Sequence, residues 1–336
     1  MHRRIQVNLN NIQMKRESKS FTDALYAILT AAQQFEGPKY MLSGLSGMAF
    51  KFSVHRRLLP MSVTAYGQWG NEHAPAIDNL GIHTAYDGGR TRHSSFEVYQ
   101  QDAIAWIKQS IDAGVGALYW IPEFGVIHGY NDADKVFYLQ DGWSGESQVV
   151  LYDNFGINFT SFWYCQVFGN QVEVPLKDAV LESLRLALYD WETPYKTWPD
   201  KEIASGRLAY SYLIQALKLG DFDSSGAAYI LDSYVYARRE IRDYLQEVHQ
   251  LIPGLDEVHH IYSELADLMT EELAVSLPSF HGTGQLAEHR QASLCAALAK
   301  AEALEERAME RVRIVSERYP DRKRSIVPRW GAHSAR

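Results

Sequence analysis

Two acidic residues, Glu123 and Asp141, stand at the ends of expected β-strands, where carboxylates could carry out chemistry. Glu123 follows the apolar run of residues 115–121, and Asp141 follows the run of residues 136–140. If the two carboxylates lie close together, like-charge repulsion raises the pKa of Glu123. Such a proton-sharing pair suits acid/base work or the binding of a cation. This strand edge is therefore the first candidate site.

The region of residues 115–156 must position these carboxylates. Residues 115–121 are apolar almost throughout, which is typical of a strand buried on both faces. The cluster Asn131-Asp132-Ala133-Asp134 is typical of a turn, because Asn and Asp side chains form hydrogen bonds with the neighbouring backbone. The sequence predicts strands over residues 115–121, 124–130, 136–140, 148–152 and 159–168.

Ser20 precedes a helical pattern and is a candidate for a structural role. The apolar spacing predicts a helix over residues 21–35, which ends at Gly37-Pro38. Asp23 follows Ser20 by three residues, as in a capping box with Asp in place of Glu or Gln. We therefore expect Ser20 to be the N-cap of this helix. Elsewhere in this half, the patterns predict strands over residues 5–9 and 62–66, a loop at 87–93 and a helix over 96–113.

Several other reactive or ligating residues have a simpler structural interpretation. Cys165 lies in an aromatic strand and is expected to be a small buried hydrophobe. His128 lies five residues after Glu123, so strand alternation places it on the opposite face, as a packed or hydrogen-bonded histidine. Gly44 and Gly47 match no phosphate-loop spacing and suit close backbone packing. His73, His83 and His93 fit no metal-ligand pattern and are expected to be solvated loop residues.

Composition bounds the classes of protein that the chain can belong to. Its 336 residues are long enough for two domains. The net charge of −8 argues against general binding of nucleic acid or of an anionic membrane. The two cysteines, Cys165 and Cys295, form no metal-spacing motif, and the N-terminal residues show no apolar signal-peptide core. We expect a soluble cytoplasmic protein without a cofactor.

The pattern changes to a helical period from Pro175 onward. Helices are expected near residues 176–191, 201–219, 225–252, 255–276 and 284–318, with Pro278 among the residues that separate them. The sequence thus predicts a first domain over residues 1–174 and an α-helical second domain over residues 175–336. The last helix combines an Ala/Leu-rich face with dense charge. It either lies on the other helices with a solvated face or forms a homo-oligomer interface.

Three stretches together resemble the family named for the N-terminal domain of butirosin biosynthesis protein H. The first, SFTDALYAILTAAQQFEG (20–37) with MLSGLSGMAFKF (41–52), is similar to the family's Cys-x-Thr-Thr-Ala-Leu helix and the Gly-rich segment after it. The second, EFGVIHGYNDADKVFYLQD (123–141), is similar to its His-bearing strand, Gly-Tyr-Asp-Asp turn and Asp-bearing strand. GRLAYSYLIQAL (206–217) and YARREIRDYLQEV (236–248) are similar to its helical half.

The resemblance implies an α+β fold: a papain-like N-terminal domain with a mostly antiparallel sheet, followed by an α-helical C-terminal domain. It also implies acyl transfer from a carrier-protein thioester to an amine, or peptide cleavage, through a Cys-His-Asp group. Carried over by position, the family's Cys falls on Ser20, its His on Glu123 and its Asp on Asp141. Two of the three positions therefore depart from the family's chemistry.

The physical effect of these departures is large. A thiol has a pKa of about 8.5 and gives a strong nucleophile beside an imidazole of pKa about 6.5. A serine hydroxyl is far less acidic, and a glutamate of pKa about 4.3 is a weaker base by roughly two units. We therefore expect a non-catalytic relative that binds a peptide, an aminated metabolite or a carrier protein in the former cleft, in a setting of secondary-metabolite biosynthesis.

Two alternatives remain open from the sequence. The first is an acyltransferase or hydrolase with altered chemistry that uses Ser20 with Glu123 and Asp141, which requires the Ser20 hydroxyl within about 3 Å of the carboxylate or one water away. The second is a magnesium or calcium site built from Glu123, Asp141 and either Asp132 or Asp134.

Overall fold

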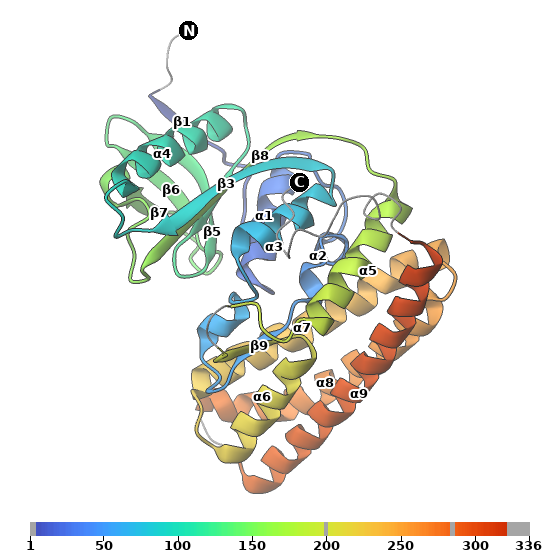
Figure 1. Ribbon diagram of the computed structural model, residues 1–336. Coiled ribbons are helices and arrows are strands. Elements are labelled where there is room, and N and C mark those ends of the chain that lie inside the picture. Colours follow the sequence, from blue (N-terminus) through green and yellow to red (C-terminus); the bar gives the residue numbers. More distant parts are fainter. Residues whose placement is uncertain (1–4, 198–200, 283–285, 321–336) are drawn as a thin grey trace. The chain divides into compact units, whose positions relative to one another are not determined.

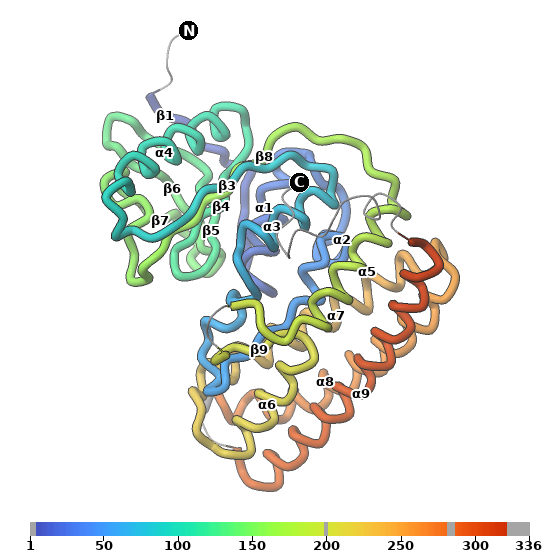
Figure 2. Tube along the Cα trace, in the orientation of Figure 1, coloured from blue at the N-terminus to red at the C-terminus, as the bar shows by residue number. Residues whose placement is uncertain are grey.

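The chain divides into two compact units, and neither is continuous in sequence. The structure, a computed structural model, describes residues 5–197, 201–282 and 286–320 (Figures 1 and 2). Unit 1 comprises Met1–Leu42 and Gly81–Glu173, and unit 2 comprises Ser43–Leu80 and Val174–Arg336. This division differs from the expected boundary at residue 174 in one respect, because residues 43–80 group with the C-terminal helices.

Unit 1 is built on an antiparallel sheet, which confirms the expected α+β class. The strands lie in the order β3-β8-β4-β5-β6-β7, and β1 pairs with β5. Their bounds are β1 Gln6–Asn8, β3 Ile82–Arg90, β4 Ala117–Trp120, β5 Phe124–Asn131, β6 Val136–Gln140, β7 Gln148–Leu151 and β8 Phe162–Gln171. The apolar runs predicted all of these except β3, where a loop was expected at residues 87–93.

Two helices pack on the sheet of unit 1 through side chains that alternate along the strands. On β4, Tyr119 belongs to the core beneath α4 (Phe96–Asp112), together with Ile107. The next residue, Trp120, contacts Phe124, whose ring lies 5.7 Å from the ring of Phe21 on α1 (Ser20–Ala31). Because successive strand residues point to opposite faces, α1 and α4 cover opposite faces of β4 and β5. The first turn of α1 thereby meets the start of β5.

Unit 2 is mainly helical. Figure 1 shows its three longest helices running side by side. The helices are α3 Trp69–Asp78, α5 Leu176–Glu192, α6 Arg207–Leu219, α7 Ser224–Val248, α8 Leu255–Gly282 and α9 Glu288–Arg318, and α2 (Lys39–Leu45) spans the boundary between the units. A two-stranded sheet joins β2 (Ser53–His55) to β9 (Ile203–Ser205). Among the described helices, none has an apolar run long enough to cross a bilayer.

Three expectations for this part of the chain are wrong. Residues 203–205 were expected to be helical but form β9, and α6 begins only at Arg207. Residues 62–66 form no strand, because Pro60 fixes the backbone at the start of a 3₁₀ helix over Pro60–Val63. Pro278 does not separate two helices, since α8 continues through it to Gly282. The predicted helical face of α9 is confirmed, because Leu298, Leu304 and other apolar residues at helical spacing are buried.

A buried ion pair lies among the helices of unit 2. The Arg238 guanidinium donates to both carboxylate oxygens of Glu305, at 2.8 and 2.7 Å, and each side chain is 1% exposed. The hydroxyls of Tyr210 and Tyr262 also donate to this carboxylate. The network joins α6, α7, α8 and α9. Burial alone would lower the pKa of Arg238, but Glu305 outweighs this effect and raises it.

The substitution Glu305→Gln should destabilise unit 2 strongly, because it leaves the Arg238 cation buried without a counter-charge. We expect a loss of about 3–5 kcal/mol in the free energy of unfolding. Chemical denaturation followed by helical circular dichroism measures it. The matched control is Glu192→Gln, which breaks an exposed pair with Arg313 (side chains 43% and 53% exposed) and should cost less than about 1 kcal/mol. Equal losses in the two variants would contradict the role of burial.

Gly44 permits a close approach between the start of unit 2 and α7. A Cβ atom at this position would overlap the ring of Tyr244, whose hydroxyl shares a 2.8 Å hydrogen bond with Ser183. The expectation of close packing at this glycine is confirmed.

Gly44→Ala should therefore lower stability by about 1–3 kcal/mol, because the added methyl group must displace a fully packed ring. Thermal unfolding of the purified variant measures the effect. Gly145→Ala is the control, since a Cβ there meets no atom within 4 Å. A Gly44→Ala protein as stable as the Gly145→Ala protein would show that the ring moves freely.

Candidate functional site

Ser20 is the first residue of α1, and it is not the N-cap. Lys19 occupies the cap position with extended backbone angles, and no side chain caps the helix. The Ser20 hydroxyl is fully buried and has no hydrogen-bond partner in the part of the chain that the structure describes. The N-cap prediction is wrong by one residue, because Ser20 already has helical geometry.

Asp23 fixes the approach to this helix in place of Ser20. Its carboxylate accepts hydrogen bonds from the backbone N–H of Glu17 at 2.9 Å and of Ser18 at 3.0 Å, and from the Ser18 hydroxyl at 3.0 Å. Lys39 donates to the same carboxylate at 2.8 Å. The Asp23 side chain therefore does bond to residues at the start of the helix, as expected, but these residues are Glu17 and Ser18 and not Ser20.

Glu123 lies in the tight turn between β4 and β5, where it forms an ion pair with Arg16. The Arg16 Nη2 atom lies 3.5 Å from the Glu123 Oε2 atom, and the arginine side chain is only 2% exposed. The backbone N–H of Arg16 donates to the Gly142 carbonyl at 3.2 Å, and its guanidinium lies 5.3 Å from the centre of the Trp143 ring. Arg16 thus connects the start of β5 with the turn that follows β6.

Asp141 is held by its own turn. One carboxylate oxygen accepts the backbone N–H groups of Trp143 and Ser144, each at 2.9 Å. The other oxygen accepts a hydrogen bond from the Gln148 side-chain amide. This is an Asx turn, which orders the hairpin between β6 and β7.

The three predicted positions are connected through their neighbours, because Arg16 pairs with Glu123 and bonds to Gly142, the residue after Asp141. Ser20 precedes Phe21, and Glu123 precedes Phe124, and these two rings are in contact. However, the Ser20 hydroxyl has no acceptor among the described residues. Glu123 is neutralised by Arg16, and Asp141 accepts neutral donors. Among the described residues, no base lies within hydrogen-bond distance of the Ser20 hydroxyl.

The acidic turn also contains carboxylates with partners of their own. Asp132 accepts from Lys108 and, at 2.9 Å, from the Tyr152 hydroxyl, while Asp134 accepts from Asn131 at 2.7 Å. Within the described residues, no group of three His, Cys, Asp or Glu side chains could hold a metal ion. The predicted oxygen-ligand site is therefore not assembled in this part of the chain.

The histidines and the strand cysteine have structural surroundings. His128 shares hydrogen bonds with the side chains of Asn8 and Ser147, both at 2.8 Å, as expected for a hydrogen-bonded strand histidine. Its burial lowers its pKa. Cys165 is buried, as predicted, and burial together with the charge of Asp87 raises the pKa of its thiol to about 12.

His73 was expected to be solvated, and this prediction is wrong. It lies in α3, is fully buried, and shares a 2.8 Å hydrogen bond with the Tyr66 hydroxyl. Burial, and secondarily the charge of Lys51, lowers its pKa. His83 and His93 are exposed, as predicted, but His83 lies in β3 and not in a loop.

The residues that the sequence interpretation missed are Arg16 and Trp143. Arg16 stands in a polar segment without periodicity, so nothing in its neighbourhood indicates burial. Trp143 is 71% exposed beside the Glu123–Arg16 pair. Gly142 is the local sequence feature that indicates a turn beside Trp143. It has a φ of +78°, and the Arg16 side chain packs against it.

Ser20→Ala should leave stability unchanged or raise it by up to about 1 kcal/mol, because it removes a buried hydroxyl that has no hydrogen bond. Ser18→Ala is the matched control. It removes the 3.0 Å bond to Asp23 and should cost about 1 kcal/mol. Chemical denaturation of both variants tests the difference, and a Ser20→Ala protein as destabilised as Ser18→Ala would show that the Ser20 hydroxyl is bonded.

Comparison with known proteins gives no relative from which a role for these residues could be taken. No protein-family model matches the chain, and a search of curated proteins gives no match. What can be said of function therefore starts from the geometry of Ser20, Arg16, Glu123, Asp141 and Trp143.

Proposed function

We propose that this protein is a non-catalytic relative of papain-like thiol acyltransferases and peptidases. In this proposal it binds an aminated ligand, such as a peptide, an aminated metabolite or an amine-bearing segment of a carrier protein, at the edge formed by Glu123, Asp141 and Trp143. The observation that carries the proposal is the ion pair between Glu123 and Arg16, which occupies the position where the resembled family has its imidazole.

The absence of catalysis is supported by the state of each reacting position. A serine nucleophile needs a base within hydrogen-bond reach. The Ser20 hydroxyl is fully buried and has no acceptor among the described residues. The Glu123 carboxylate is already engaged in an ion pair with the Arg16 guanidinium at 3.5 Å. These facts weigh against the alternative of an altered acyltransferase or hydrolase.

The preference for an amine is supported by charge and exposure. Arg16, Glu123 and Asp141 together carry one net negative charge, because the donors to Asp141 among the described residues are all neutral. The Glu123 side chain is 26% exposed and the Trp143 side chain is mostly open to solvent. An ammonium group can therefore contact the carboxylates while it lies over the free part of the indole, an interaction worth about 0.5–1 kcal/mol at an exposed site.

The proposal is tested first by turnover. The full chain is incubated with an acyl-N-acetylcysteamine thioester and a primary amine, and the release of thiol is followed spectrophotometrically. We expect release at the rate of buffer alone, in the natural protein and in Ser20→Ala alike. Thiol release by the natural protein that is lost in Ser20→Ala would overturn the proposal and favour the altered enzyme.

Binding is tested separately by calorimetric titration with the peptide Gly-Lys-Gly amide and with putrescine. We expect Trp143→Ala to weaken binding by about three- to fivefold, the factor that corresponds to the loss of a cation–π contact. Trp106→Ala is the control, because Trp106 is also exposed, at 40%, but lies on α4. Absence of binding to both amines, or equal effects of the two substitutions, would contradict an amine site at this edge.

A further inference from the structure

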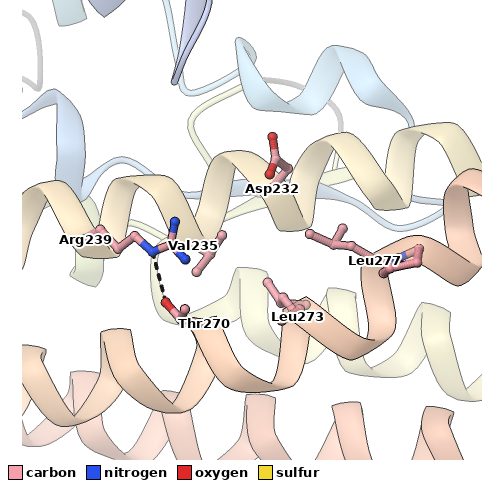
Figure 3. Close-up of a pocket in the computed structure, with 8 residues that line it drawn as sticks. Asp232, Val235, Arg239, Thr270, Leu273 and Leu277 are labelled. Carbon is pink, nitrogen blue, oxygen red and sulfur yellow. Dashed lines mark hydrogen bonds between the residues drawn. The ribbon is translucent and has the colours of Figure 1, made fainter.

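Helices α7 and α8 of unit 2 enclose an open cavity that the proposed function does not use. Its volume is about 460 Å³, within the range of about 300–1,000 Å³ that is usual for small-molecule sites. Figure 3 shows Arg239 and Thr270 together at one end of the cavity and Leu277 at the other, with Val235 and Leu273 between them. The cavity thus has a polar end and an apolar body.

The polar end carries the Arg239 cation, which has no acidic partner among the described residues. Three arginines lie on α7, and two of them are paired: Arg238 with Glu305, and Arg242 with Asp243 and Asp267. The third, Arg239, donates its Nε–H to the Thr270 hydroxyl at 3.0 Å and forms no ion pair within the described residues. Its terminal nitrogens remain available for an anion.

The rest of the lining determines how an anion can be oriented. Pro278 has no N–H, so the carbonyl of Ala274 loses its usual helical donor and stands as an acceptor one turn from Thr270. Asp232 also lines the cavity, but its carboxylate points away from α8 (Figure 3). It lies seven residues from Arg239, about 10 Å along the helix axis, so solvent screens most of its repulsion.

From this arrangement we infer that the α7–α8 cavity binds a monocarboxylate with an apolar tail. The carboxylate accepts hydrogen bonds from the free Arg239 nitrogens, which present a planar fork that fits two carboxylate oxygens. The tail lies against Val235, Leu273 and Leu277, where its burial removes apolar surface from water. The Thr270 hydroxyl holds the guanidinium in place through its bond to Nε.

The experiment is a calorimetric titration of the full chain with sodium octanoate, with sodium acetate and octan-1-ol as probes of the two halves of the ligand. We expect saturable binding of octanoate, and binding of both acetate and octanol that is weaker by about tenfold or more, since each lacks one set of contacts. Octanol that binds as tightly as octanoate would show a purely apolar cavity and would overturn the inference. Failure of octanoate to bind at millimolar concentration would overturn it as well.

Two substitutions locate the site. Arg239→Gln should weaken octanoate binding by about tenfold or more, whereas Arg242→Gln, on the next turn but paired with acidic neighbours, should leave it unchanged. Leu277→Ala should weaken octanoate binding and leave acetate unaffected. Equal binding by the natural protein and Arg239→Gln would refute the role of the unpaired arginine. These outcomes are independent of the amine site, which lies in unit 1.

Discussion

A buried cation requires a counter-charge, and this constraint governs both units. In unit 1 the Arg16 side chain is almost wholly inside, and its guanidinium is matched by Glu123 and by the face of Trp143. In unit 2, Arg238 is matched by Glu305. Taking a guanidinium out of water costs several kcal/mol unless such partners are present. The positions of these partners therefore fix which helices and turns must come together.

The same constraint decides what the candidate site can do. Glu123 is the counter-charge of the buried Arg16 side chain, so a structural role at this position competes with a catalytic one. Asp141 is similarly engaged, because it orders the hairpin whose turn carries Trp143. In the proposed function, this edge acts by recognition through charge and an exposed ring.

Much of the fold follows from local pattern, and the site follows only in part. Apolar runs predicted β4 to β8, and helical spacing predicted α5 to α9, because burial of one face leaves a periodic trace. β3 was missed because Gly88-Gly89 is typical of a loop. In the structure, a Cβ atom at Gly88 would lie 2.8 Å from the carbonyl oxygen of Trp163 on β8, and glycine allows this close approach. The partners of Arg16 and Glu305 lie far along the chain, and no local pattern indicates such pairs. Whether Ser20 is the N-cap or the first residue of α1 depends on a shift of one residue in the start of the helix. Sequence patterns do not resolve such a shift.

The discontinuous composition of unit 2 has a consequence for synthesis on the ribosome. Residues 43–80 emerge before the whole of 81–173, yet their partners come later: Val54 pairs with Ala204 across β2 and β9, and Lys51 bonds with Asp190. At about 5–20 residues per second, the nascent segment waits several seconds or more for these partners. During that interval unit 1 can complete its sheet around a protruding loop that carries exposed apolar residues. Such a loop is a natural client for a chaperone, and translation speed through residues 81–204 sets how long it needs one.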